Sequence, residues 1–385
     1  MDLVFANDST DNNIYVLLGN GAGGFAAPKT FKAGTNPNWA ALGDFNGDKK
    51  IDLIVGNSST FGGTAEYNSS VYLGNGDGTF AAGRGVGDPL QFFDGINQIE
   101  VGDFNGDGKL DALMATNSLG FRLVIGDGTG GFSSATGGAP FGEASPVVAD
   151  FNRDGKSDYA YIAGPVSVLL GTATSNPTIY EMPGAIQLTA ADINFDGKQD
   201  LIGLSQKGVL IRIGNGDGTF GELVTYSSGM KNSTMSVLDA DGDGRLGILV
   251  AGTFTVIQTQ SIGWAVLRGT RDGGLNAPRL NIAFPVNPNF GGDGIQQLLA
   301  ADFNRDGVDD LLALAGGERF ATLLGNGIGG FKITAPVNSE ITSQAVQVRD
   351  FNRDGNPDLA ILAGHISTIK FYLGEGKGAL PRRRK

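Results

Sequence analysis

Oxygen-bearing side chains recur in this sequence at the fixed spacing of a nine-residue segment. In the copy that begins at Asp103, acidic or amide side chains occupy positions 1, 3, 5 and 9, and Gly108 occupies position 6. Alternate side chains of such a loop point inward, and glycine permits the positive φ of a sharp turn. All-oxygen donors on a flexible loop favour Ca²⁺ over Mg²⁺ or Zn²⁺. The alternative is a metal-free turn in which Asp and Asn bond to their own backbone.

The segment occurs seven times, and its starts lie on average 51 residues apart. We predict that about six or seven of these loops bind calcium through four side chains and the carbonyl group of position 7. The predicted ligands are Asp44, Asn46, Asp48, Lys50 and Asp52 in loop 1; Asp103, Asn105, Asp107, Lys109 and Asp111 in loop 2; Asp150, Asn152, Asp154, Lys156 and Asp158 in loop 3; Asp192, Asn194, Asp196, Lys198 and Asp200 in loop 4; Asp239, Asp241, Asp243 and Arg245 in loop 5; Asp302, Asn304, Asp306, Val308 and Asp310 in loop 6; and Asp350, Asn352, Asp354, Asn356 and Asp358 in loop 7.

The seven loops are not equivalent. Loop 5 has Gly247 at position 9 and so lacks one carboxylate, which predicts the weakest site. Loop 1 has Lys49 where the other loops have glycine, and a side chain forced to positive φ costs on the order of 1 kcal/mol. We therefore expect loop 1 to be the second weakest site.

The acidic balance of the chain comes mostly from these loops. Lys and Arg number 28 and Asp and Glu number 40, a formal net charge of −12. Three acidic ligands in each of seven loops account for 21 of the 40, and seven Ca²⁺ ions would change −12 by 14 charges, to +2. An acidic chain argues against nucleic acid as the partner, because nucleic-acid binders show a basic patch. No apolar run reaches the length of a transmembrane helix, and membrane insertion is not expected.

Each repeat predicts four short β-strands. Strand A leads into the loop, strand B follows it, strand C comes next, and a glycine-rich turn leads to strand D, which opens on a phenylalanine such as Phe80 or Phe132. The runs are short, β-branched or aromatic, and separated by Gly and Asn, as in hairpins. Four-stranded units repeated at this period predict an all-β fold, a β-propeller. We expect seven or eight blades, favour eight, and place them in a single domain over residues 1–385.

The blade boundaries follow from the positions of the loops. Full repeats are predicted to start near residues 37, 96, 145, 186, 234, 296 and 344, and residues 2–36 form a partial blade that lacks strand A. Met1 and Asp2 align with loop positions 8 and 9, so we interpret the N-terminus as truncated within a repeat. No signal peptide is visible in the sequence, and with a truncated N-terminus its absence carries no information.

The loop, the strand after it and the Gly-rich Phe turn together resemble the FG-GAP/VCBS repeats of integrin α-subunit propellers and bacterial surface proteins. This resemblance covers nearly the whole chain and implies the same calcium ligands. It is specific for fold and unspecific for function, because the family includes adhesion modules, fungal lectins and non-catalytic parts of enzymes.

Two repeats carry long insertions, which all fall at B–C or D–A connections. Antiparallel strands put these connections on the face opposite the calcium loops. Long loops with aromatic residues on a rigid scaffold are common binding sites, although ordinary variation in loop length is the alternative. The predicted ligand-contacting residues are Phe61, Tyr67, Phe92 and Phe93 in the first expanded repeat, with insertions at 57–70 and 91–94, and Phe284 and Phe290 in the other, with insertions at 253–263 and 281–294.

These features predict a non-catalytic, calcium-binding, extracellular or cell-surface propeller, a monomer that recognises a glycan or a protein. Two alternatives stay open: the propeller of a polysaccharide-active enzyme resembling a lyase, and a scaffold domain of a larger surface protein. An enzyme would need basic or phenolic side chains converging in one cleft. The sequence has no cysteine and one histidine, His365, and shows no such set.

Overall fold

The computed structural model describes most of the chain as β-strands joined by tight turns. The described residues are 2–6, 12–21, 24–34, 36–57, 69–86, 95–116, 120–139, 146–173, 176–239, 243–256, 259–270, 274–277, 279–285, 295–315, 319–328, 330–335, 337–338, 343–363, 369–378 and 380. They contain no helix, and so none that could cross a bilayer.

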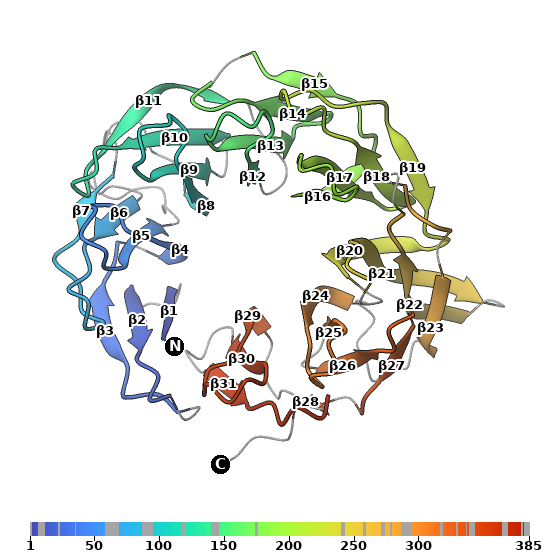
Figure 1. Ribbon diagram of the computed structural model, residues 1–385. Helices are drawn as coiled ribbons and strands as arrows, with labels where there is room; N and C mark the ends of the chain where they lie inside the picture. The colour runs from blue at the N-terminus through green and yellow to red at the C-terminus, as the bar shows by residue number, and fades with distance from the viewer. Residues whose placement is uncertain are drawn as a thin grey trace. The chain divides into compact units, whose positions relative to one another are not determined.

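The chain divides into two compact units. The first comprises Met1–Asn20, Phe25–Pro183 and Gly214–Thr219, and the second comprises the rest. The first unit holds four antiparallel sheets (Figure 1). Their strands are β1 (Leu3–Ala6), β2 (Asn13–Leu17) and β3 (Lys29–Lys32); β4 (Pro37–Gly43), β5 (Asp52–Asn57), β6 (Ser69–Tyr72) and β7 (Arg84–Gly85); β8 (Ile96–Gly102), β9 (Asp111–Thr116), β10 (Phe121–Gly126) and β11 (Phe132–Ala139); and β12 (Val147–Ala149), β13 (Asp158–Ile162), β14 (Val166–Leu169) and β15 (Thr178–Tyr180).

The second unit holds four more sheets of the same kind. Their strands are β16 (Ala185–Ala191), β17 (Asp200–Ser205), β18 (Gly208–Arg212) and β19 (Val224–Ser227); β20 (Lys231–Leu238), β21 (Gly247–Val256), β22 (Thr259–Leu267) and β23 (Arg279–Pro285); β24 (Ile295–Ala301), β25 (Asp310–Ala315), β26 (Arg319–Gly325), β27 (Phe331–Ile333) and β28 (Val337–Asn338); and β29 (Ser343–Arg349), β30 (Asp358–Ala363) and β31 (Ile369–Tyr372).

Eight sheets confirm the predicted fold, an all-β propeller of eight blades. Strands follow one another in chain order within each sheet, with β28 added beside β26 in one of them. The first sheet has three strands and lacks strand A, as expected from the sequence. Because the sheets are meanders, the A–B loops and C–D turns of a unit lie on one face and the B–C and D–A connections on the other.

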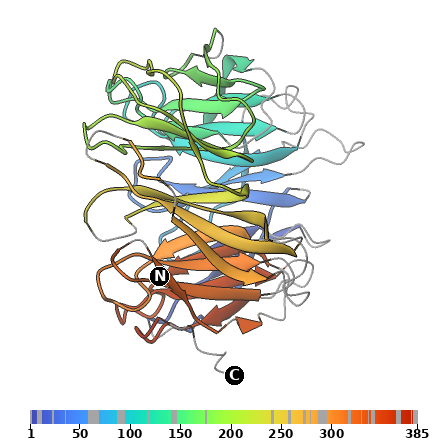
Figure 2. The same cartoon turned by 90° about the vertical axis from the view of Figure 1, so that its right-hand side faces the viewer.

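The hydrophobic core of each unit lies between neighbouring sheets, which stack face to face (Figure 2). Ile54 of β5 packs in one cluster with Met114 of β9, and Leu249 of β21 packs in another with Leu311 of β25. Strand B supplies the most deeply buried positions: every residue of β5, β13 and β17 is buried. Continuous apolar strands of this kind are expected where both faces of a sheet are covered.

One sequence expectation is wrong. Residues 253–263 were expected to form an inserted loop, but the described part extends a hairpin in which Thr253 pairs with Ile262 and Val256 with Thr259. The segment is rich in Thr, Val and Phe, and β-branched and aromatic residues favour pairing over an irregular loop. Residues 281–285, also expected in a loop, belong to β23.

Candidate metal sites

The aspartate at position 1 organises every A–B loop. In loop 2, Asp103 Oδ1 accepts the Gly106 N–H at 2.7 Å and the Asp107 N–H at 3.2 Å, and Oδ2 accepts the Gly108 N–H at 2.8 Å. Backbone N–H groups of position 6 donate in the same way to Asp44, Asp150, Asp192, Asp239, Asp302 and Asp350. The carboxylate therefore holds the sharp turn that the spacing predicted.

The side chains at positions 3 and 5 also accept hydrogen bonds from the backbone of the loop. Asn105 Oδ1 accepts the Asp107 N–H at 2.8 Å, and Asp107 Oδ1 accepts the Lys109 N–H at 3.0 Å. Each is a local bond from a side chain to the backbone two residues on, the Asx turn weighed as the metal-free alternative. Equivalent bonds reach Asn46 and Asp48, Asn152 and Asp154, Asn194 and Asp196, Asn304 and Asp306, and Asn352 and Asp354.

The aspartate at position 9 ties the loop to the glycine-rich turn of its own blade. Asp111 is fully buried; its Oδ2 accepts the Phe104 N–H and its Oδ1 the Gly126 N–H, both at 2.9 Å. Asp52, Asp158, Asp310 and Asp358 make the same two bonds, and Asp200 bonds the Ile193 N–H. In the first sheet, Asp2 accepts the Gly19 N–H at 2.9 Å, which matches its predicted place at position 9.

The bond from the Gly126 N–H to Asp111 explains why the C–D turn begins with glycine. A Cβ added at Gly126 would lie 2.2 Å from the Leu110 carbonyl oxygen, far inside van der Waals contact. Strand C must therefore approach the end of the loop at a position without a side chain, which brings its N–H to Asp111.

Burial has an electrostatic cost at position 9. Loss of solvent raises the pKa of Asp111, Asp158 and Asp358, and it raises the pKa of Asp310 to about 6, although backbone N–H donors oppose each shift. A nearby cation would favour the ionised form of these groups.

Two positions adopt left-handed backbone in the six loops that the structure describes in full, and the sequence pointed to only one. Position 6 has positive φ throughout the described loops, including Lys49 at 63°. Position 4 has positive φ as well: it is Gly106 in loop 2 at 78°, but Arg153 in loop 3 at 61° and Phe195 in loop 4 at 59°. Non-glycine residues at position 4 hid this requirement from sequence reasoning. Arg305 and Arg353 share the strained conformation.

Cationic side chains at position 7 pair with the aspartate at position 5 in four loops. Lys198 Nζ lies 3.0 Å from Asp196 Oδ2. The same pairing joins Lys50 to Asp48, Lys109 to Asp107 and Arg245 to Asp243. Loops 6 and 7 have Val308 and Asn356 there and lack the paired cation.

Loop 5 keeps the turn but lacks the last carboxylate. Asp239 and Asp243 accept the expected backbone bonds, and Asp241 lies outside the described residues. At position 9, a Cβ on Gly247 would lie 2.8 Å from the Leu267 carbonyl oxygen, so a side chain fits only if that carbonyl shifts. Next to this loop, the Asp309 carboxylate accepts the Asp239 N–H, while burial, Asp239 and Asp302 raise the pKa of Asp309.

Successive blades also touch through their loops and turns. The Gly130 N–H donates to the Phe45 carbonyl at 3.1 Å, and the Gly378 N–H to the Phe303 carbonyl at 3.2 Å. In both cases the turn of one blade bonds position 2 of the preceding loop. The phenylalanine rings are buried in the core, as predicted for Phe45, Phe104, Phe151, Phe303 and Phe351.

The chemistry of the donor set fits calcium. All side-chain donors are hard oxygens, and an oxygen that accepts one N–H bond retains a lone pair for a metal. In the described loops, however, no three acidic, histidine or cysteine side chains converge on one point. Calcium binding by these loops therefore stays a prediction.

The aromatic residues predicted to contact a ligand are not placed. Phe61, Tyr67, Phe92, Phe93 and Phe290 lie outside the described residues, as does His365. The backbone of Phe284 belongs to β23, where it pairs with Ile262.

Comparison with known proteins identifies the class. A family model for the FG-GAP-like repeat matches residues 1–55, 59–114, 103–161, 171–250 and 302–361. The chain belongs to the FG-GAP-like repeat family. No curated protein sequence matches it.

Two solved structures are similar to this chain at low identity. A lectin of Agrocybe aegerita that recognises non-reducing terminal N-acetylglucosamine is 18% identical with a TM-score of 0.56, over 99% of this chain and 88% of that one. The periplasmic gluconolactonase PpgL of Pseudomonas aeruginosa is 13% identical with a TM-score of 0.48, over 99% of each chain. At such identities the likeness is one of fold.

Proposed function

We propose that this chain is a non-catalytic recognition propeller of an extracellular or cell-surface protein, stabilised by calcium, that binds glycans. One observation carries the proposal. In the described loops the carboxylates that could do acid–base chemistry accept backbone N–H bonds, as Asp103 and Asp111 do. They are therefore committed to shaping the blades, and recognition is left to the opposite face.

Two further points support the proposal. That opposite face carries an open hollow lined by polar side chains in the second unit. A lectin of the same fold recognises non-reducing terminal N-acetylglucosamine, so such a scaffold can present a sugar site. A protein ligand and a scaffold role within a larger protein are the competing outcomes.

The test is a glycan array probed with the calcium-loaded chain and repeated after chelation. The proposal expects binding to a defined set of glycans that is lost or weakened with EDTA and restored by added calcium. Binding to none of the glycans would reject it. Breakdown of a bound polysaccharide, detected by assays for reducing ends and unsaturated products, would instead favour the alternative of a polysaccharide-active enzyme.

A further inference from the structure

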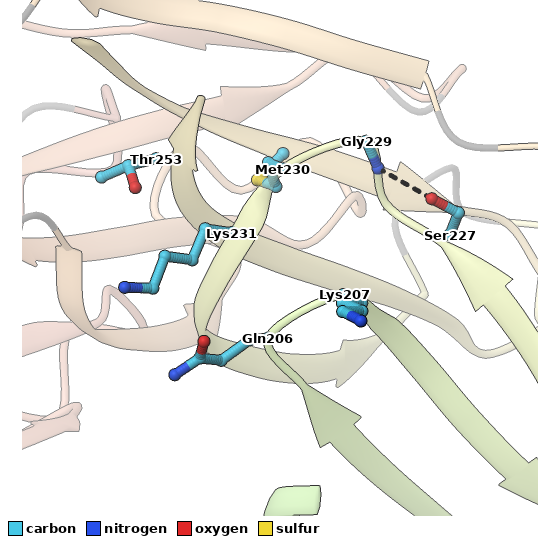
Figure 3. Close-up of a pocket in the computed structure, with 7 residues that line it drawn as sticks. All are labelled: Gln206, Lys207, Ser227, Gly229, Met230, Lys231 and Thr253. Atoms are coloured by element: carbon cyan, nitrogen blue, oxygen red, sulfur yellow. Dashed lines mark hydrogen bonds between the residues drawn. The ribbon is translucent and has the colours of Figure 1, made fainter. Parts of the chain in front are cut away.

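A hollow of about 670 Å³ opens between two consecutive blades of the second unit, on the face opposite the A–B loops (Figure 3). The Gln206–Lys207 turn between β17 and β18 forms one wall. The connection from β19 to β20, with Ser227, Gly229 and Met230, forms the base, and Lys231 and Thr253 form the other wall. Of these residues, only Thr253 belongs to a segment singled out from the sequence, the insertion at 253–263. The two lysines were not singled out, because a lysine in a short turn has no distinctive spacing.

The backbone around the hollow is held in place by small hydroxyl side chains. Ser205 Oγ accepts the Gly208 N–H at 3.1 Å and donates to the Gly208 carbonyl, which fixes the first turn. Ser228 is fully buried and donates to the Met230 carbonyl at 3.3 Å. On the far wall, Ser233 Oγ bonds the Ile295 carbonyl of the next blade at 2.9 Å. The walls are therefore formed before any ligand arrives.

Polar groups converge on this space. Lys231 pairs directly with Thr253 across β20 and β21, and side chains of directly opposed residues lie on the same side of a sheet. In Figure 3 the Lys231, Thr253 and Gln206 side chains extend to the same side. Met230 lines the hollow but is only 7% exposed, because its side chain packs into the core.

The charge of the hollow is opposite to that of the chain. The described residues of its lining include two lysines and no acidic residue, in a chain whose formal net charge is −12. Within the described residues, Lys207 and Lys231 make no ion pair, whereas Lys198 in the same unit is paired with Asp196. Two exposed ammonium groups that have no ion pair among the described residues attract an anion.

We propose that this hollow binds an acidic sugar residue, a pyranose that carries a carboxylate. The positive charge of the two lysines attracts the carboxylate, and Gln206 and Thr253, which extend to the same side as Lys231, hydrogen-bond the ring hydroxyls. A volume in the range of small-molecule sites accommodates a sugar, whereas a bare oxyanion would leave most of it empty. The inference rests on the proposed glycan recognition and names its ligand class.

The experiment is calorimetric titration of the calcium-loaded chain with α-1,4-linked tetragalacturonate and with its fully methyl-esterified form, which is neutral. The acid should bind with an affinity that falls as salt rises, and the ester should bind at least about tenfold more weakly. Lys231→Gln and Lys207→Gln should each weaken binding of the acidic tetrasaccharide by about tenfold. Lys332→Gln, an exposed lysine of β27 outside the hollow, is the matched control and should leave binding unchanged.

The other outcomes distinguish a failure of this inference from a failure of the proposed function. Both lysines are exposed, so the variants should fold, and circular dichroism checks this. Equal binding of acid and ester, or binding unaffected by either lysine variant, overturns this inference while the proposed function stands. Inorganic phosphate that competes as well as the sugar shows a simple anion site and overturns the sugar assignment. A chain that binds neither these probes nor any glycan on an array rejects both proposals.

Discussion

Lys50 Nζ lies 3.1 Å from Asp48 Oδ2, within the loop predicted to bind calcium. The ammonium group thus lies beside a carboxylate that would also attract a metal ion. Both side chains are partly exposed, so the pair itself contributes little to stability. Its consequence concerns calcium: in the four loops where a basic residue at position 7 pairs with the aspartate at position 5, metal and side chain compete for that aspartate.

The first prediction follows from that competition. Lys198→Gln removes the cation 3.0 Å from Asp196 and should strengthen calcium binding at loop 4 by a few-fold, in line with an exposed pair worth about 0.2–1 kcal/mol. Calcium titration by calorimetry at low salt measures it. Lys332→Gln serves as the control for a general change in net charge. An affinity equal to or lower than that of the parent would contradict the competition.

Calcium removal should destabilise the chain. Each loop gathers about three carboxylates that repel one another without a cation. At a calcium concentration 100 times the Kd, each occupied site adds about 2.7 kcal/mol to the free energy of unfolding. Thermal melting in excess EDTA and in millimolar calcium tests this, with magnesium as the control. Identical midpoints would show that the loops are metal-free Asx turns.

Loop 5 should hold calcium most weakly, because Gly247 supplies no carboxylate. Asp243→Ala should then leave the number of tightly bound ions unchanged, while Asp107→Ala in loop 2 should remove one. Gly247→Asp should add only modest affinity, since its Cβ would lie 2.8 Å from the Leu267 carbonyl oxygen. Loss of one tight ion on Asp243→Ala would refute the ranking.

The calcium-free chain should lose stability as pH rises from about 4 to about 6.5. Burial raises the pKa of Asp310 to about 6, so the folded state retains this proton longer than the unfolded state. Below the unfolded-state pKa, the protonated Asp310 adds about 2 kcal/mol to the free energy of unfolding. This contribution is lost as pH rises through the folded-state pKa. Asp111, Asp158 and Asp358 shift in the same direction.

Urea unfolding in metal-stripped buffers at both ends of this range measures the effect. Exposed carboxylates such as Asp48 and Asp107 have a lowered pKa, so their protonation changes stability only below about pH 4, outside this window. Saturating calcium should remove or reverse the trend, because the metal favours the ionised carboxylate. Calcium-free stability that increases from pH 4 to 6.5 would exclude the raised pKa values.

The close approach at Gly126 gives a prediction about stability alone. Gly126→Ala places a Cβ 2.2 Å from the Leu110 carbonyl oxygen and should displace the N–H from Asp111, at a cost of about 2–3 kcal/mol or more. Gly108→Ala is the matched control: it also alters a loop glycine, but its Cβ meets nothing within 4 Å. It should cost about 1 kcal/mol through its positive φ. Equal losses in urea unfolding would show that the contact at Gly126 relaxes freely.

Much of the fold could be predicted because the signals are local and repeated. The spacing from Asp103 to Asp111, followed by an apolar strand and a Gly-Phe turn, fixes one blade, and its repetition fixes the rest. The left-handed position 4 could not be predicted, since Arg153 and Phe195 carry no sign of positive φ. The hollow at Lys207 and Lys231 depends on two segments brought together by packing, which no short-range pattern encodes.

The bonds from Gly130 to Phe45 and from Gly378 to Phe303 run in the same direction along the chain, from a turn back to the preceding loop. The bond from Gly218 to Phe151 follows the same rule. At these three junctions the earlier repeat presents an acceptor to its successor, and the later repeat presents a donor to its predecessor, in a head-to-tail order. Duplication or loss of one complete repeat of this kind in the gene would leave such a donor opposite an acceptor of the same kind. On this face, the number of blades can change during evolution without the invention of a new contact.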